Sequence, residues 1–222
     1  MRKLFSFPLS APCRKVRLAL AEKRLTCDLI EERGWERRPD FLMLNPAAET
    51  PVLVESSGLV AADSAAILEH LEESYPEIPL LPVDPAGRAE ARRLAAWFDG
   101  KFAREVTAPL TYERLFKRLK GEGPPNSERL RIGSANLRHH LDYFGWLADR
   151  RRYLAGEALS FADLAGAAHL SCLDYLGAVP WSHNEAAKLW YMRIKSRPSF
   201  RSLLADALPG IPPQPRYADL DF

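Results

Sequence analysis

The residues best suited to chemistry lie near the start of the chain, where an apolar run meets a helix. Leu4 to Phe7 has the composition of a strand, and Ser10 and Cys13 follow it. Pro12 suits the first turn of a helix, because the amide proton that proline lacks would have no partner there. Unpaired amides and the positive dipole at such a helix start stabilise a thiolate or another anion. Ser10 and Cys13 therefore mark a candidate thiolate or anion site.

Two further short motifs carry groups that could hold a small ligand. Asp63-Ser64 precedes an apolar helix and has the composition of a helix cap. Thr50-Pro51 opens an apolar run, and we expect this bond to be cis, because only X-Pro bonds reach the cis form at low cost. Each motif also has a purely structural interpretation, as a cap or as a turn.

Other kinds of site find little support. Cys13, Cys27 and Cys172 are irregularly spaced, which favours reduced thiols over disulfides or zinc ligands. His139-His140 has no partner at ligand spacing, so we place it on a helix surface and predict no metal site. The formal net charge of +2 does not indicate nucleic-acid binding. No apolar run approaches the ~20 residues that span a membrane, and a signal peptide is not expected. These features predict a cytoplasmic protein without membrane insertion.

The elements that must position these residues begin with an N-terminal domain of mixed structure. Strand-like runs at 4–7 and 26–30 flank the first helix, which predicts a βαβ unit with a parallel pair. Runs at 51–54 and 59–61 predict two antiparallel strands before the helix capped by Asp63-Ser64. The predicted order is βαβ-ββα over residues 1–75.

The rest of the chain is predicted to be all helical, apart from its end. Prolines punctuate residues 76–85, which we interpret as a linker, and the helical domain then covers 86–208. Long amphipathic segments run over 86–119, with a break expected at Pro109, and over 127–150. Ser160 and Asp163 form a Ser-x-x-Asp capping box that starts another helix. Residues 209–222 are a proline-rich tail that favours an extended course.

Taken together and in order, these motifs resemble those of the glutathione transferase superfamily. The resemblance runs from about Leu4 to Leu208, and its segments are 4–5 with Ser10, 16–20, 50–53, 63–67, 160–163 and 196–200. It implies a thioredoxin-like N-terminal domain, an all-helical C-terminal domain and a homodimer. The fold it implies is specific, whereas an activity has to be argued from the site.

The resemblance also implies roles for the polar residues of the first domain. Asp63 and Ser64 would hold the γ-glutamyl end of glutathione, and the backbone of Thr50 beside Pro51 would pair with its cysteinyl unit. Ser10 would donate a hydrogen bond to the glutathione thiolate.

Two positions depart from the family's pattern. Cys13 stands where a glutaredoxin-like Cys-x-x-Cys has its second cysteine, but Ser10 replaces the first, so we expect no dithiol chemistry. Glu49 stands where the family often has Lys or Gln, and an acid there faces an anionic ligand unfavourably. We therefore expect weak or absent glutathione binding.

The transferase pattern leaves two segments without a role. One is the charged loop from Glu31 to Asp40, which contains Trp35, and the other is the end of the tail. Each either folds back onto its own domain or docks a partner. We expect the docking interpretation to hold and the tail to lie outside the core, with Trp35, Tyr217, Asp219, Leu220, Asp221 and Phe222 as the contact residues.

A transferase-like fold with this loop and this tail resembles the transferase-like bacterial division proteins that bind FtsZ filaments. The resemblance implies a non-catalytic dimer without a cofactor, which binds FtsZ at the division site, promotes filament curvature and supports constriction. The alternative is a glutathione transferase or isomerase in which Ser10 activates the glutathione thiol. A third possibility is a stress-type scaffold that binds other proteins but not FtsZ.

Overall fold

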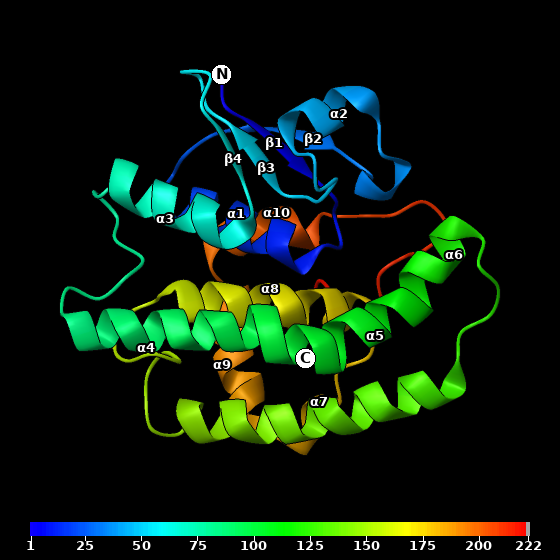
Figure 1. Cartoon of the computed structure of the whole chain (residues 1–222). Coiled ribbons are helices and arrows are strands. Elements are labelled where there is room, and N and C mark those ends of the chain that lie inside the picture. The colour runs from blue at the N-terminus through cyan, green and yellow to red at the C-terminus, as the bar shows by residue number, and fades with distance from the viewer. Residues whose placement is uncertain (221–222) are drawn as a thin grey trace. The chain divides into compact units, whose positions relative to one another are not determined.

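The structure, a computed structural model of the chain, describes residues 1–220 (Figure 1). The chain divides into two compact units, one spanning Met1–Leu80 and a second that begins at Leu81. Among residues 1–220, no helix combines the length and the apolar character needed to cross a membrane.

The first unit, all of whose residues are described, contains a four-stranded sheet in the order β2-β1-β3-β4. β1 runs parallel to β2 and antiparallel to β3, and β3 runs antiparallel to β4. The elements are β1 (Lys3–Ser6), α1 (Ala11–Glu22), β2 (Asp28–Glu31), η1 (Gly34–Glu36), α2 (Pro39–Leu44), β3 (Val52–Val54), β4 (Val60–Ala62) and α3 (Ser64–Ser74). The thioredoxin-like arrangement expected from the sequence is confirmed.

The core of this unit follows from the two periodicities of the chain. Successive side chains of a strand point to opposite faces, so Leu4 and Phe5 of β1 serve different layers. Leu4 is fully buried, and the ring of Phe5 lies 5.8 Å from that of Phe41 in α2. In α3 the buried face includes Ile67 and Leu71 at helical spacing.

The segment after α3 is fixed to the first unit by a buried lysine. Lys23 Nζ donates to the carbonyl oxygens of Tyr75 (2.9 Å) and Ile78 (2.8 Å) and lies 2.8 Å from Glu72 Oε2. Glu72 in turn accepts the amide N–H of Leu80. Residues 76–80, which the sequence places in a linker, are therefore bonded to the first unit.

The second unit consists of helices around α8, a helix whose residues are all buried. α4, η2, α5 and α9 pack against it. The elements are α4 (Pro85–Ala96), η2 (Trp97–Thr107), α5 (Ala108–Thr111), η3 (Tyr112–Phe116), α6 (Lys117–Lys120), α7 (Ser127–Ala148), α8 (Phe161–Tyr175), η4 (Trp181–His183), α9 (Glu185–Lys195), η5 (Pro198–Phe200) and α10 (Arg201–Leu204).

The break expected at Pro109 is wrong, because the chain stays helical through it. The helix widens to π geometry in η2, where the amide N–H of Ala108 donates to the carbonyl of Ala103, five residues back. Pro109 lacks the N–H that an α-helix would direct to the carbonyl of Glu105. Asn136 of α7 donates its side-chain N–H to that carbonyl instead, at 3.1 Å. A side chain from another helix thus donates to a carbonyl to which Pro109 cannot donate.

The capping box at the start of α8 is present and connects several elements. Asp163 Oδ2 accepts the Ser160 amide (3.0 Å) and hydroxyl (3.1 Å). Its Oδ1 accepts the Leu154 amide and the Trp190 indole N–H, both at 2.9 Å. Burial raises the pKa of Asp163, and these hydrogen bonds oppose the rise.

Candidate functional site

One end of the sheet in the first unit brings the predicted site segments together. Phe5 pairs with Val52 and Val52 pairs with Ala62, while Ser6 pairs with Glu31. The ends of β1, β2 and β4 therefore lie beside the start of β3. The segments leading to Ser10, Trp35, Thr50 and Asp63 leave or enter the sheet at this end.

The helix start after β1 uses Cys13 and Ser10 differently. Ser10 is the half-buried N-cap residue of α1, and its side chain makes no capping hydrogen bond to that helix. Cys13 is fully buried, and its Sγ accepts the amide N–H of Phe7 at 3.4 Å. The Cys13 thiol thus contributes a hydrogen bond to the fold, whereas the Ser10 hydroxyl makes no capping hydrogen bond to its own helix.

The peptide bond between Thr50 and Pro51 is cis, which confirms the expectation from the sequence. Asn45 orders the loop before it by donating its side-chain N–H to the Glu49 carbonyl at 2.8 Å. Thr50 is half-buried, and the Glu49 side chain is exposed. A carboxylate therefore stands next to the Thr50 backbone, whose role in binding glutathione remains a prediction.

Asp63 and Ser64 lie at the start of α3. Asp63 Oδ1 accepts the amides of Ala65 (2.7 Å) and Ala66 (3.2 Å), so Asp63 caps this helix. Its φ of +74° is uncommon for a residue other than glycine, and local side-chain hydrogen bonds make aspartate one of the residues that tolerate it. Asp63 is exposed and Ser64 is buried. The capping role is established, and the ligand role remains a prediction.

Trp35 belongs to the same end of the sheet. Its half-buried ring meets Phe7 edge-on, with centroids 5.1 Å apart. A Cβ atom on the preceding Gly34 would lie 2.0 Å from the carbonyl oxygen of Ala48, so glycine allows the two loops to approach closely. The sequence reasoning missed Gly34 and Phe7, although a single glycine within a charged run is a signal for close backbone approach.

The charges around Trp35 are largely paired with one another. Arg38 lies 2.5 Å from the buried carboxylate of Glu32, and Arg33 lies 3.2 Å from Glu31. These residues and Glu36 line a hollow of about 220 Å³. This part of the surface therefore presents paired charges beside one aromatic ring.

The expectation that the whole tail stands apart from the core is wrong. The Tyr175 hydroxyl donates to the Ile211 carbonyl at 2.7 Å, and the Tyr175 carbonyl accepts the Gln214 amide at 2.9 Å. Tyr217 is 1% exposed, and its hydroxyl donates to the Leu203 carbonyl at 3.0 Å. Burying a large ring whose hydroxyl has a partner is favourable, so Tyr217 packs into its own unit and does not act as an exposed anchor.

The described part of the tail that follows the buried Tyr217 is short. Ala218, Asp219 and Leu220 are exposed, and Leu220 retains 41% of its surface. The predicted contact residues Asp221 and Phe222 lie outside the described residues. Of the predicted tail contacts that are described, Asp219 and Leu220 can reach a partner without local unfolding.

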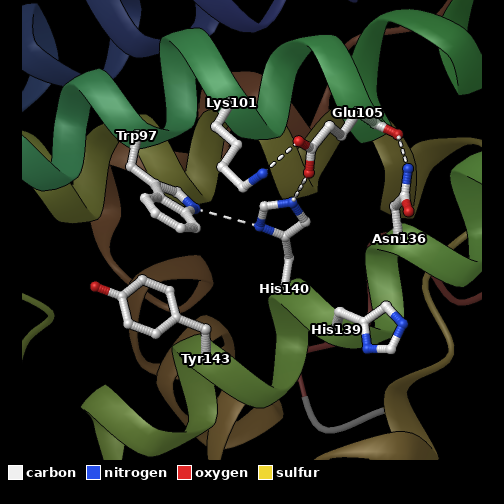
Figure 2. A pocket seen from close by; sticks show the side chains of 7 residues that line it. All are labelled: Trp97, Lys101, Glu105, Asn136, His139, His140 and Tyr143. Atoms are coloured by element: carbon white, nitrogen blue, oxygen red, sulfur yellow. Dashed lines mark hydrogen bonds and ion pairs between the residues drawn. The ribbon is translucent and has the colours of Figure 1, made fainter.

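A groove of about 360 Å³ lies between η2 and α7 of the second unit (Figure 2). Its floor is His140, which is buried, so the prediction that the histidine pair lies on the surface holds for His139 alone. His140 Nδ1 accepts the Trp97 indole N–H at 3.2 Å, and His140 Nε2 lies 3.0 Å from Glu105. This pairing assigns a neutral imidazole with its proton on Nε2, and burial lowers the His140 pKa. No group of three or more metal-ligating side chains occurs among residues 1–220.

Comparisons with known proteins identify relatives that share this fold. Residues 4–79 match the family described as "Glutathione S-transferase, N-terminal domain". The chain is 52% identical to FtsZ-localized protein A of Caulobacter vibrioides over 224 residues, which cover 100% of this chain and 98% of that protein.

Two solved structures are similar along the entire chain. FzlA from C. crescentus has a TM-score of 0.98 and 52% identity, covering 100% of this chain and 99% of that one. A glutathione S-transferase from Rhodospirillum rubrum F11 also has a TM-score of 0.98, with 54% identity and full coverage of both chains. The fold is therefore shared with proteins that carry two different functional names.

Proposed function

Since this chain belongs to the glutathione S-transferase superfamily, we propose that it is an FtsZ-binding member of that superfamily. It binds FtsZ filaments at the division site as a homodimer, favours their curvature and supports constriction. The observation that carries the proposal is the similarity to FtsZ-localized protein A, which extends through the tail as well as the transferase fold.

Two surfaces of the chain support this proposal. One is the loop with the half-buried Trp35, and the other is the exposed end of the tail with Asp219 and Leu220. A twofold dimer presents each surface twice, so weak contacts with a polymer add through avidity. This explains how a small protein could bridge or bend filaments.

The experiment is co-sedimentation of the purified protein with polymerised FtsZ. Deletion of residues 218–222 retains the buried Tyr217, so it removes the exposed tail without opening the core. We expect this deletion, Asp219→Lys and Asp221→Lys to abolish pelleting with FtsZ, and added salt to weaken pelleting of the wild type. Trp35→Ala should weaken binding through the loop.

Glu157→Lys is the matched control, because it reverses an exposed acid of the same unit that is not part of the tail. We expect it to pellet like the wild type. Full-strength binding by both the deletion and Asp219→Lys would falsify the docking role of the tail.

The second candidate function is glutathione-dependent catalysis, and the Ser10 hydroxyl, unused by its own helix, favours it. Ser10, Thr50, Asp63 and Ser64 would hold glutathione, which supplies the nucleophilic thiol. The exposed Glu49 carboxylate opposes an anionic ligand.

Titration calorimetry with reduced glutathione tests this candidate. We expect no micromolar binding by the wild type and tighter binding by Glu49→Gln. A micromolar dissociation constant for the wild type, with a thiol-transfer activity that Ser10→Ala removes, would establish the enzyme instead.

A further inference from the structure

A buried ion pair lies beside the point where the tail packs onto the second unit. Lys195 Nζ of α9 lies 3.1 Å from Asp174 Oδ2 of α8, and both side chains are 2% exposed or less. Asp174 also accepts the Trp181 indole N–H at 3.0 Å and the Tyr191 hydroxyl at 3.3 Å. The carboxylate thus holds the ammonium group in one place.

The ammonium group faces the tail. Lys195 Nζ lies 5.4 Å from the centroid of the Tyr217 ring and 5.8 Å from that of Tyr191. These distances are within the range of a cation–π interaction, which is stronger away from water. Burial lowers the pKa of Lys195, and the carboxylates of Asp174 and Asp219 oppose this shift. Lys195 is therefore linked electrostatically to two residues of the tail, Tyr217 and Asp219.

The Tyr217 ring is held on other sides as well. It meets the Tyr175 ring edge-on at 5.2 Å, and its hydroxyl donates to the Leu203 carbonyl. Apolar packing alone would bury the ring equally well, but it is not directional. An ammonium group requires the face of the ring, so it restricts the orientation of Tyr217 and of the chain that follows.

We propose that Lys195 is a positioning residue for the docking segment, by which we mean residues 218–220. Held by Asp174, it orients Tyr217 and thereby fixes the direction in which Ala218–Leu220 leave the unit, so that Asp219 and Leu220 are presented to FtsZ in one arrangement. A segment oriented in advance loses less conformational entropy on binding. This inference rests on the proposed function.

The test combines binding with a proteolysis assay that needs no FtsZ. Arg216 is exposed, and no Lys or Arg follows it, so trypsin cleavage after Arg216 releases residues 217–222 as one peptide. Cleavage requires this turn to open, because a protease binds an extended chain. The release rate, followed by mass spectrometry, therefore reports how firmly Tyr217 is held.

The principal variant is Asp174→Asn with Lys195→Met, which removes both buried charges and keeps similar volumes and an amide oxygen for Trp181. We expect release of the peptide to be faster on the order of tenfold, and co-sedimentation with FtsZ to weaken. Arg193→Met is the matched control, because it removes an exposed cation of the same helix. It should release and bind like the wild type.

A second pair of variants separates the ammonium–ring interaction from apolar packing. Tyr217→Phe keeps the ring and loses only the hydroxyl, whereas Tyr217→Leu keeps an apolar side chain without a ring. We expect Tyr217→Phe to release the peptide faster than the wild type, because the Leu203 carbonyl loses its donor, and Tyr217→Leu to release it faster still, like the double variant. Equal release rates for Phe and Leu would overturn the role of Lys195.

The assays also distinguish this inference from the proposed function. If the wild type does not pellet with FtsZ, the proposed function is wrong, and release rates alone decide whether Lys195 holds the segment. A double variant that releases the peptide quickly but binds FtsZ at full strength would overturn the positioning role. Unchanged release and unchanged binding would overturn it as well.

Discussion

Asp163 shows how one side chain can serve both as a cap and as a core connector. Its carboxylate joins the start of α8 to Leu154 in the preceding loop and to Trp190 in α9. An exposed cap satisfies only the amides of its own helix. A buried one leaves several donors without partners when it is removed, and each of these carries a desolvation cost.

We therefore expect Asp163→Ala to lower the free energy of unfolding by about 3 kcal/mol, measured by urea denaturation. Asp84→Ala is the control, because Asp84 is an exposed cap of α4 that accepts the Gly87 amide at 2.7 Å. Its loss should cost about 1 kcal/mol. Equal losses for the two variants would show that the contacts of Asp163 with Leu154 and Trp190 add nothing.

At the scale of elements, the long helical stretch from α4 to α6 depends on its neighbour α7. Asn136 supplies the hydrogen bond that Pro109 cannot give to the Glu105 carbonyl (Figure 2). The continuity of the helix through Pro109 is thus a property of two elements together.

A double-mutant cycle tests this dependence. Asn136→Ala should lower the free energy of unfolding by about 1 kcal/mol, because it leaves the Glu105 carbonyl without this partner. In a Pro109→Ala background the new amide can bond to that carbonyl, so the same substitution should cost clearly less. Additive costs in urea denaturation would argue against the compensation.

A second connection between elements involves Glu90 of α4. It accepts hydrogen bonds from Arg93 (2.8 and 3.0 Å) and from Arg151 (2.7 Å), which lies after α7. The pKa of Glu90 is lowered from 4.5 to about 2. The largest cause is hydrogen bonding from Arg93, and hydrogen bonding from Arg151 adds to it. The ionised form is favoured in the folded state, so the stabilisation is complete above pH 4.5 and is lost as the pH falls to about 2.

We expect Glu90→Gln to melt lower than the wild type at neutral pH and to lose this difference as the pH falls toward 2. Melting temperatures across that range, followed by circular dichroism, provide the measurement. A difference that stays constant with pH would mean that the ionisation of Glu90 contributes nothing.

At the scale of the whole molecule, α7 carries a face that suits a second copy of the chain. Ile132 and Trp146 are 49% and 50% exposed, and His139 and Tyr143 lie between them, seven and eleven residues after Ile132 and therefore close to whole helical turns away. Apolar residues at this spacing share one side of a helix. We expect this face, together with the N-terminal unit and the η2 groove, to form a dimer contact.

Light scattering is expected to give twice the chain mass of 25.0 kDa at micromolar concentration. Trp146→Glu should shift the mass toward the monomer, because it places a charge in an apolar contact. Leu189→Glu changes an equally exposed residue of α9 and should leave the mass unchanged. A wild type that is monomeric under these conditions would rule out the dimer.

The sequence by itself determined the features that depend on neighbouring residues. Helical spacing, strand composition and the Ser160–Asp163 box depend on rules that act over a few residues, so the thioredoxin-like order and the helical domain could be predicted. The cis bond before Pro51 could also be predicted, because proline chemistry narrows the candidates. The family resemblance rests on the same local motifs.

Only the tertiary structure decided which of these side chains are buried and which distant residues contact them. Tyr217 is an aromatic residue in a proline-rich tail, which is typical of a docking anchor, but Tyr175 and Leu203 bury it. His140 is next to an exposed histidine, but Trp97 and Glu105 enclose it. Pro109 predicts a helix break, but the helix continues, and Asn136 donates to the Glu105 carbonyl to which Pro109 cannot donate. In each case the partner is distant in the chain, and no local pattern specifies which distant side chain will be present to satisfy a polar group or cover a ring.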